Sequence, residues 1–237
     1  MEKIKIFGLG GLDETGKNTY VIEVQDQIFV FDCGIKYADG NLFGIDYIIP
    51  DYDYLIKNKK KIKGVFITHG HYENMGAAFD LAKTIPGIKF YATNYTKFVL
   101  TDLGVKEESI VEITPNKRLN FGKVSIFPLA VSHSVPGAVM YFLNTSHGAI
   151  CYTGDFIIDP MMNGAYDMDL GKIAYVGKQG VLCLLSESAF SEHPGHTSPS
   201  HRLKGFFADI LNKYDNRVLF SVLPTHLYTI QDIFDAA

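Results

Sequence analysis

The chain has 237 residues, of which 47% are hydrophobic and 20% charged, and its formal net charge is −4 at pH 7. These values are typical of a globular protein that forms one large domain, or one domain and part of another, and they exclude a disordered chain. The negative balance also excludes a protein that holds nucleic acid mainly through an overall basic surface. A nucleic-acid role would depend on a local site or on parts of a longer protein.

Apolar periodicity and turn residues predict that strands and helices alternate along the chain. In chain order, the pattern predicts an opening strand at 3–11, a hairpin at 18–34 that turns at Gln25 and Asp26, a buried strand at 62–70, a helix at 76–85, a strand at 88–93, a helix at 94–104, strands at 123–133, 137–146 and 148–155, a buried strand at 180–188 and an amphipathic helix at 199–214. A strand at 216–223 and a helix at 225–234 then indicate a second unit that the chain does not complete. We expect an α/β protein with layered sheets.

The compartment is predicted from the cysteines and from the apolar runs. Cys33, Cys151 and Cys183 lie in or beside apolar stretches without a CxxC pair, which is typical of buried, reduced thiols. The N-terminus lacks an apolar signal core, and no apolar run approaches the roughly 20 residues that span a bilayer. We expect a soluble cytoplasmic protein with no membrane partner. The lysine-rich run 57–63 is interpreted as a solvated helix end or turn.

Four apolar stretches end in residues that can bind metal or support a metal ligand: "FVFDCG" at Asp32, "VFITHGH" at His69 and His71, "LAVSHSVPG" at His133, and "ICYTGDF" at Asp155. Ligands gather at one end of the strands in layered α/β folds, so we expect these side chains to meet. Imidazole and carboxylate together suit zinc or manganese. A pair of such ions sharing a carboxylate would activate water and clamp a phosphodiester.

Longer stretches around these residues resemble a known family. "GLGGLDETGKNTYVIEV", "DCGIKYADGNLFGIDYIIPDYDYLIKNKKKIKGVFITHGH", "TGDFIID" and "VLCLLSESAFSEHPGHTSPS" are similar, in this order, to stretches of ribonuclease J, from the β-CASP branch of the metallo-β-lactamase superfamily. The resemblance covers essentially the whole chain. It implies a metallo-β-lactamase αββα sandwich over residues 1–200 and the incomplete start of a β-CASP domain over residues 201–237.

The resemblance also implies a role for each motif residue. His69, His71 and His133 would hold the first metal, and Asp155 would bridge two metals. Asp32 would brace the ligand loops through hydrogen bonds without binding metal. Glu187 matches the acidic residue that opens the β-CASP motif series.

The chain departs from the family at the second metal. Where the family has H-x-H-x-D-H, Glu73 and Asn74 replace the Asp and the final His. The family's later metal-binding His is not in this chain, and His226 is not a substitute, because its stretch aligns with the start of a β-CASP helix. There Tyr228 and Thr229 replace a His and an Arg, which removes a cation that would contact phosphate.

These departures predict one bound metal, zinc or alternatively manganese, with Glu73 and Asp155 as the candidate catalytic carboxylates and Glu73 and Asn74 as a degenerate second site. A full two-metal centre, and a fossil site whose residues only hydrogen-bond to one another, stay open as alternatives. The resemblance implies hydrolysis of single-stranded RNA, which we expect to be weak or lost here.

Two other functions stay open. The first is a non-catalytic or RNA-binding paralogue that pairs with an active ribonuclease J subunit. The second is a small hydrolase of thioesters or lactones, which the altered motif disfavours.

The remaining histidines are interpreted as structural: His147 as a hairpin-turn residue, and His193, His196 and His201 as residues of a Pro/Gly/Ser loop. Gly8, Gly10 and Gly11 do not complete a G-x-G-x-x-G nucleotide motif.

Overall fold

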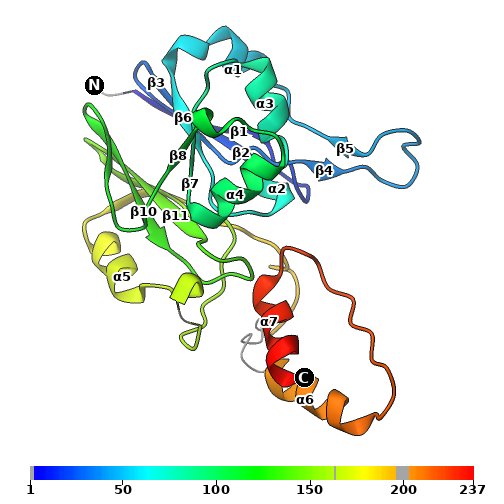
Figure 1. Cartoon of the computed structure of the whole chain (residues 1–237). Coiled ribbons are helices and arrows are strands. Elements are labelled where there is room, and N and C mark those ends of the chain that lie inside the picture. Colours follow the sequence, from blue (N-terminus) through cyan, green and yellow to red (C-terminus); the bar gives the residue numbers. More distant parts are fainter. Residues whose placement is uncertain (1–2, 163, 196–202) are drawn as a thin grey trace.

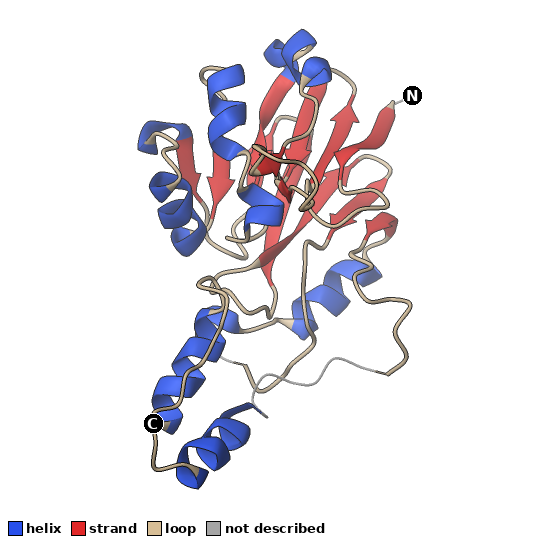
Figure 2. Ribbon diagram, turned by 90° about the vertical axis from the view of Figure 1, so that its right-hand side faces the viewer, coloured by secondary structure: helices blue, strands red, loops and turns tan. Residues whose placement is uncertain are grey.

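The computed structural model describes residues 3–162, 164–195 and 203–237. Two β-sheets pack face to face, and helices cover their outer faces (Figures 1 and 2). This arrangement confirms the predicted αββα layers. Among the described residues, no helix is both long enough and apolar enough to cross a membrane.

The first sheet has six strands in the order β1-β2-β3-β6-β7-β8. They are β1 (Ile4–Gly10), β2 (Thr19–Val24), β3 (Gln27–Phe31), β6 (Ile62–Phe66), β7 (Phe90–Ala92) and β8 (Ile110–Glu112). The first three are antiparallel, and Gln25, with a φ of 55°, makes the predicted turn between β2 and β3. From β3 to β8 the strands are parallel, so each connection crosses the outer face of the sheet.

Helices fill these crossovers. They are α1 (Asp53–Lys57), α2 (Tyr72–Met75), α3 (Ala78–Thr84) and α4 (Asn94–Asp102). Short 3₁₀ turns, η1 (Lys59–Lys61) and η2 (Glu107–Ser109), precede β6 and β8. The lysine-rich run therefore lies at a helix end before a strand, as predicted. The sequence analysis missed α1, α2 and a two-stranded hairpin of β4 (Lys36–Tyr37) and β5 (Tyr47–Ile48), which extends away from the sandwich (Figure 1).

The second sheet has five strands in the order β13-β12-β11-β10-β9. They are β9 (Leu119–Phe121), β10 (Val124–Ala130), β11 (Val139–Thr145), β12 (Gly148–Tyr152) and β13 (Val181–Leu185). Strands β9 to β12 are antiparallel to their neighbours, whereas β12 and β13 are parallel to each other. The 3₁₀ turn η3 (Gly164–Tyr166) and helix α5 (Leu170–Lys178), neither of which was predicted, lie in the connection from β12 to β13.

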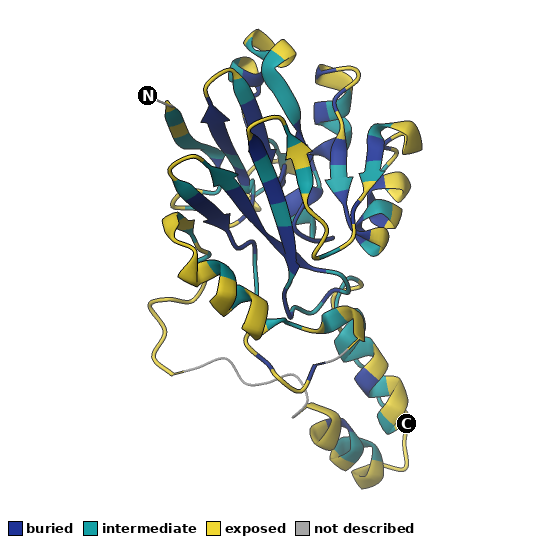
Figure 3. Ribbon diagram, turned by 90° about the vertical axis from the view of Figure 1, so that its left-hand side faces the viewer, coloured by how far each residue is buried: buried dark blue, intermediate teal, exposed yellow. Residues whose placement is uncertain are grey.

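Alternation along the strands separates the apolar side chains into layers. Phe31 and Phe66 point between the sheets, where Phe31 lies 5.7 Å and Phe66 5.8 Å from Tyr141 of β11, measured between ring centroids. Their neighbours Val30 and Val65 face the helices instead. Both strands are thus buried on both faces, and they hold the loops that follow them in a rigid frame (Figure 3).

Strand β13 corrects one prediction. The sequence indicated a buried strand at 180–188, and the strand is present, but Leu182 is 50% exposed and Leu184 is 61% exposed. A continuous apolar run predicts burial on both faces, yet β13 lies at the edge of its sheet. Cys183 and Leu185 pack against the core between the sheets, whereas Leu182 and Leu184 are left exposed.

The C-terminal segment holds two helices, α6 (Leu203–Lys213) and α7 (Leu227–Ala236), which pack on each other to one side of the sandwich (Figures 1 and 3). Both were predicted. The strand predicted at 216–223 is wrong: residues 217–223 have no regular structure. A strand needs a neighbour to pair its backbone groups, and no described strand lies alongside this segment. The assignment of residues 201–237 to a β-CASP domain stays a prediction.

Candidate metal centre

The predicted ligands meet at one end of the sandwich. His69 and His71 follow β6 in the first sheet, whereas His133 follows β10 and Asp155 follows β12 in the second. One ligand atom from each of these four residues lies within 4.8 Å of the others, and no other such group of His, Cys, Asp and Glu occurs among the described residues. The structure therefore brings these four side chains together, as the strand-end argument expected.

The spacing of the three imidazoles fits one metal ion. His71 Nδ1 lies 3.0 Å from His69 Nε2 and 3.1 Å from His133 Nε2. Tetrahedral ligands at the usual zinc–nitrogen distance would be separated by about 3.3 Å. His69 Nε2 lies 3.6 Å from Asp155 Oδ2, which completes a set of three nitrogens and one oxygen. This donor set suits zinc, and manganese is the alternative.

Asp32 is fully buried and accepts hydrogen bonds from three parts of the chain. Its carboxylate accepts from the Thr68 backbone amide at 2.8 Å, the Tyr152 hydroxyl at 2.9 Å and the Asn74 side-chain amide at 2.9 Å. Asp32 also adopts a φ of 59°, a conformation that costs free energy in a non-glycine residue. The bracing role predicted for Asp32 agrees with this geometry.

Asp32 also orients His69 through the hydroxyl of Thr68. The Thr68 hydroxyl donates to Asp32, with Oγ1 2.9 Å from Oδ2, and Thr68 Oγ1 lies 2.9 Å from His69 Nδ1. Because the single hydroxyl proton is directed at the carboxylate, His69 Nδ1 must be the donor in the second contact. Nε2 of His69 then presents its lone pair to the other ligands, which is the tautomer that binds metal.

Asn74 was predicted as part of a degenerate second site, but its side chain instead hydrogen-bonds to Asp32. Its Nδ2 donates to Asp32, and its Oδ1 accepts from Asn18 Nδ2 at 3.3 Å. The residue is fully buried. The family motif predicted that Asn74 lies at the site. It did not predict that the side chain bonds to Asp32 and Asn18, because these partners lie 42 and 56 residues away.

Glu73 precedes Asn74 on α2 and is partly exposed. Its backbone oxygen accepts from the Asn18 amide at 3.1 Å, and the backbone of Gly34 passes so close that a side chain there would collide with Glu73. Its carboxylate lies outside the four-residue group but contributes to the charge around Asp155. The predicted catalytic role of Glu73 stays a prediction.

Burial sets the protonation of the ligands. It lowers the pKa of His71 to about 4 and that of His133 to about 3, so both rings are neutral near pH 7. Burial, followed by the Glu187 carboxylate, raises the pKa of Asp155 to about 7. Neutral imidazoles are the metal-binding form, whereas Asp155 must lose a proton when metal binds below its pKa.

Glu187, predicted as a motif acid, lies directly after β13 and next to the Asp155 loop. Its Oε1 accepts from the Phe156 amide at 3.3 Å, and its own amide donates to Thr153 Oγ1 at 3.2 Å. The carboxylate therefore ties the end of β13 to the loop that carries Asp155. Its assignment to a β-CASP motif is not tested by this geometry.

His226 was excluded from the site by its sequence, yet it contacts the site. It precedes α7, and its ring centroid lies 5.3 Å from that of His71, at an interplanar angle of 48°. Its nitrogens lie outside the four-atom ligand group, so it does not replace the missing metal ligand in this arrangement. No local pattern predicted the contact, because it depends on how the C-terminal segment packs on the sandwich.

The other histidines lie elsewhere. His147 occupies the exposed turn between β11 and β12, as predicted, and His193 is exposed beside Glu192. His196 and His201 fall outside the described residues.

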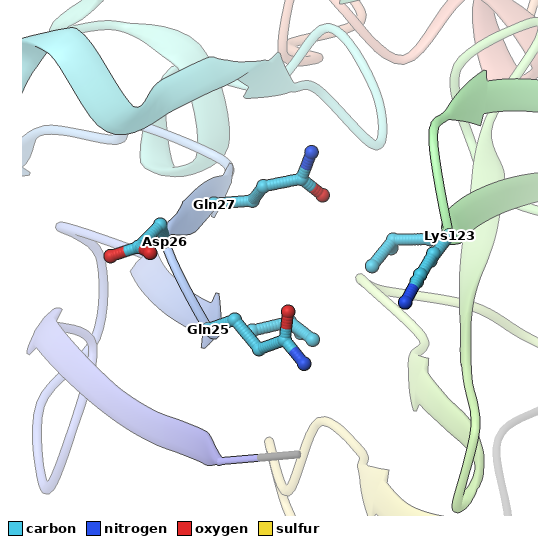
Figure 4. A pocket seen from close by; sticks show the side chains of 6 residues that line it. Gln25, Asp26, Gln27 and Lys123 are labelled. Atoms are coloured by element: carbon cyan, nitrogen blue, oxygen red, sulfur yellow. The ribbon is translucent and has the colours of Figure 1, made fainter.

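A hollow of about 230 Å³ between the β2–β3 turn and Lys123 is lined by Gln25, Asp26 and Gln27 (Figure 4). It contains none of the metal-binding side chains.

Comparison with known proteins identifies similar chains. The family described as the metallo-beta-lactamase superfamily matches residues 12–204. Ribonuclease J2 of Bacillus subtilis (strain 168) is 36% identical over all of this chain and 43% of its own length. Ribonuclease J 1 of Streptococcus pyogenes serotype M3 is 36% identical over 99% of this chain and 42% of its own length. The chain thus spans less than half the length of these relatives.

A solved structure supports the fold. A protein of unknown function from Enterococcus faecalis V583 superposes with a TM-score of 0.70, covering 99% of this chain and 63% of that one. Its sequence identity is 15%, so the likeness concerns the fold alone.

Proposed function

The chain belongs to the metallo-β-lactamase superfamily, and from that premise we propose that it is a ribonuclease J-like protein of RNA processing with one divalent metal ion at its centre. The convergence of His69, His71, His133 and Asp155 carries the proposal. The similarity to proteins named ribonuclease J supports RNA as the ligand, and we propose that the RNA is single-stranded. The free cysteines support a cytoplasmic location.

A divalent ion bound here would supply a Lewis acid that polarises a phosphoryl oxygen and activates water. His69, His71 and His133 would hold it as neutral ligands, and Asp32 would keep His69 in the required tautomer. Asp155 would complete the ligand set through one carboxylate oxygen, and its other oxygen would be the candidate proton acceptor at the reacting centre. Glu73 is the second candidate for that role.

We propose that hydrolysis is weak or lost in this chain. A second metal would need ligands of its own, but Asn74 is bound to Asp32 and Glu73 lies outside the four-residue group. A two-metal site clamps the attacking and leaving oxygens together, and one ion supplies only part of that stabilisation.

A non-catalytic role in partnership with an active ribonuclease J is the second candidate. The exposed apolar side chains of β13 and of the segment before α7 favour it, because Leu184 is 61% and Leu219 is 87% exposed. Apolar side chains with this degree of exposure are typical of interaction surfaces when they lie in one patch.

Metal content and nuclease activity separate the candidates. We expect about one zinc per chain by elemental analysis and little cleavage of 5′-labelled single-stranded RNA in manganese. Two metals per chain, with strong cleavage that His71→Ala abolishes, would contradict the one-metal proposal. Association with a full-length ribonuclease J that Leu184→Glu abolishes would support the partner role.

A further inference from the structure

His226 is held against the metal centre by the docking of α7. The backbone amide of Tyr228 donates to the Ser134 oxygen, at 3.4 Å, in the loop that carries His133. The Tyr228 ring packs edge-on against Tyr166 at 5.0 Å between centroids. These two contacts attach the start of α7 to the sandwich on the side where His133 lies, so the position of His226 is defined by more than its own ring contact.

The ring nitrogens of His226 form no hydrogen bond in the described part of the protein. It makes no side-chain bond to cap α7, although it occupies the N-cap position, and none of the hydrogen bonds there involve its nitrogens. The residue is only partly exposed, and its ring touches that of His71. Half-buried polar groups of this kind are usually satisfied by a ligand or by water.

The surroundings of His226 indicate what that ligand would be. His71 and His133 lie near its ring. Burial lowers the pKa of His226, and the Glu73 carboxylate opposes part of that effect. Because the His226 ring touches His71, an anion held at the metal ligands would lie beside an imidazole whose nitrogens have no other partner among the described residues. An N–H donor within about 2.7–3.2 Å of an oxygen forms a hydrogen bond, and one to a charged oxygen is among the stronger ones.

We propose that His226 is a substrate-binding residue that donates a hydrogen bond to a phosphate oxygen of the RNA at the metal centre. This inference rests on the proposed function, because it takes the bound group to be a phosphodiester. It assigns the C-terminal segment a direct part in the site. Tyr228 and Thr229, which resemble neither the His nor the Arg of the family, then need not supply the contact.

Two other roles for His226 make different predictions. A packing residue would only fill space beside His71, so a ring of similar size would serve equally well. A positioning residue would act on the metal through His71, whose Nε2 is buried without a partner among the described residues. His226→Phe keeps a ring but removes the nitrogens, and His226→Gln keeps a donor but removes the ring.

The test measures zinc and RNA separately in the 237-residue chain. Zinc affinity is measured by competition with a chelating dye, and affinity for a fluorescent single-stranded oligoribonucleotide by anisotropy in the zinc-loaded protein. We expect His226→Phe to weaken RNA binding about tenfold and to leave zinc affinity unchanged. His226→Gln should retain most of the RNA affinity. His147→Phe, at an exposed turn, is the matched control and should change neither.

Each other result overturns the inference. Wild-type RNA affinity in His226→Phe would make it a packing residue. Loss of zinc affinity in either variant would make it a positioning residue for His71. If the wild-type zinc-loaded chain does not bind the oligonucleotide at all, the proposed function itself fails, and the inference with it. A melting curve for each variant separates these results from unfolding.

Discussion

The side-chain amide of Asn74 donates to the carboxylate of Asp32, with 2.9 Å between Nδ2 and Oδ2, in a fully buried contact. The alignment placed Asn74 at a lost metal ligand, but the structure shows it supporting a ligand loop. The same residue therefore stands where the family has an imidazole of the second metal, and it donates a hydrogen bond to the carboxylate that supports the first site.

We predict that Asn74→Ala weakens both the fold and the metal site. It would leave one lone pair of the buried Asp32 carboxylate without its donor, at a cost of about 1–3 kcal/mol in the free energy of unfolding. Zinc affinity should fall about tenfold or more, because Asp32 orients His69 through Thr68. Urea unfolding and dye competition measure the two effects. Asn120→Ala, at an exposed position of β9, is the control, and equal losses in both variants would contradict the role of Asn74.

Zinc should stabilise the fold through the three imidazoles. An ion that binds only the native state adds about 2.7 kcal/mol at a hundredfold excess over its dissociation constant. We expect a corresponding rise in melting temperature on adding zinc, and its loss in His133→Ala. His147→Ala should behave as wild type. An unchanged melting temperature in the wild-type protein would favour the fossil site.

Zinc affinity should depend on pH through Asp155. Its pKa of about 7 in the metal-free protein means that zinc displaces a proton below that pH and none above it. The apparent affinity should therefore fall by about tenfold per pH unit as the pH decreases from 7 towards 5. The pKa of His71 is about 4 and that of His133 about 3, so these rings add no proton in this range. Calorimetry in buffers of different ionisation enthalpy counts the released proton. A release of two or more protons at pH 6 would show that a histidine titrates as well.

The interface between the sheets should dominate stability. Phe66 is fully buried and stacks on Tyr91 with ring centroids 4.6 Å apart. Phe66→Ala should lower the free energy of unfolding by about 3–5 kcal/mol. Phe43, which is 94% exposed in the loop between β4 and β5, is the matched control, and Phe43→Ala should change it by less than about 0.5 kcal/mol. Urea denaturation measures both. A comparable loss at Phe43 would mean that this loop is covered by a partner.

The sequence by itself determined the local patterns. Apolar runs bounded by turn residues placed β2, β3, β6 and β7. The residues after β6, β10 and β12 predicted the ligand group, because strand ends on one side of a layered sheet converge. The H-x-H spacing and the longer family stretches added the order of the ligands. These inferences need only neighbouring residues and the general geometry of strands.

Tertiary structure alone decided how distant segments meet. It left β13 exposed at a sheet edge and residues 217–223 without a strand partner, although both stretches are apolar. It turned Asn74 towards Asp32 and brought His226 against His71 across 155 positions of the chain. The physical reason is the same in each case. Periodicity records which side chains avoid water, whereas pairing, burial by another layer and hydrogen-bond partners depend on residues far away in the sequence.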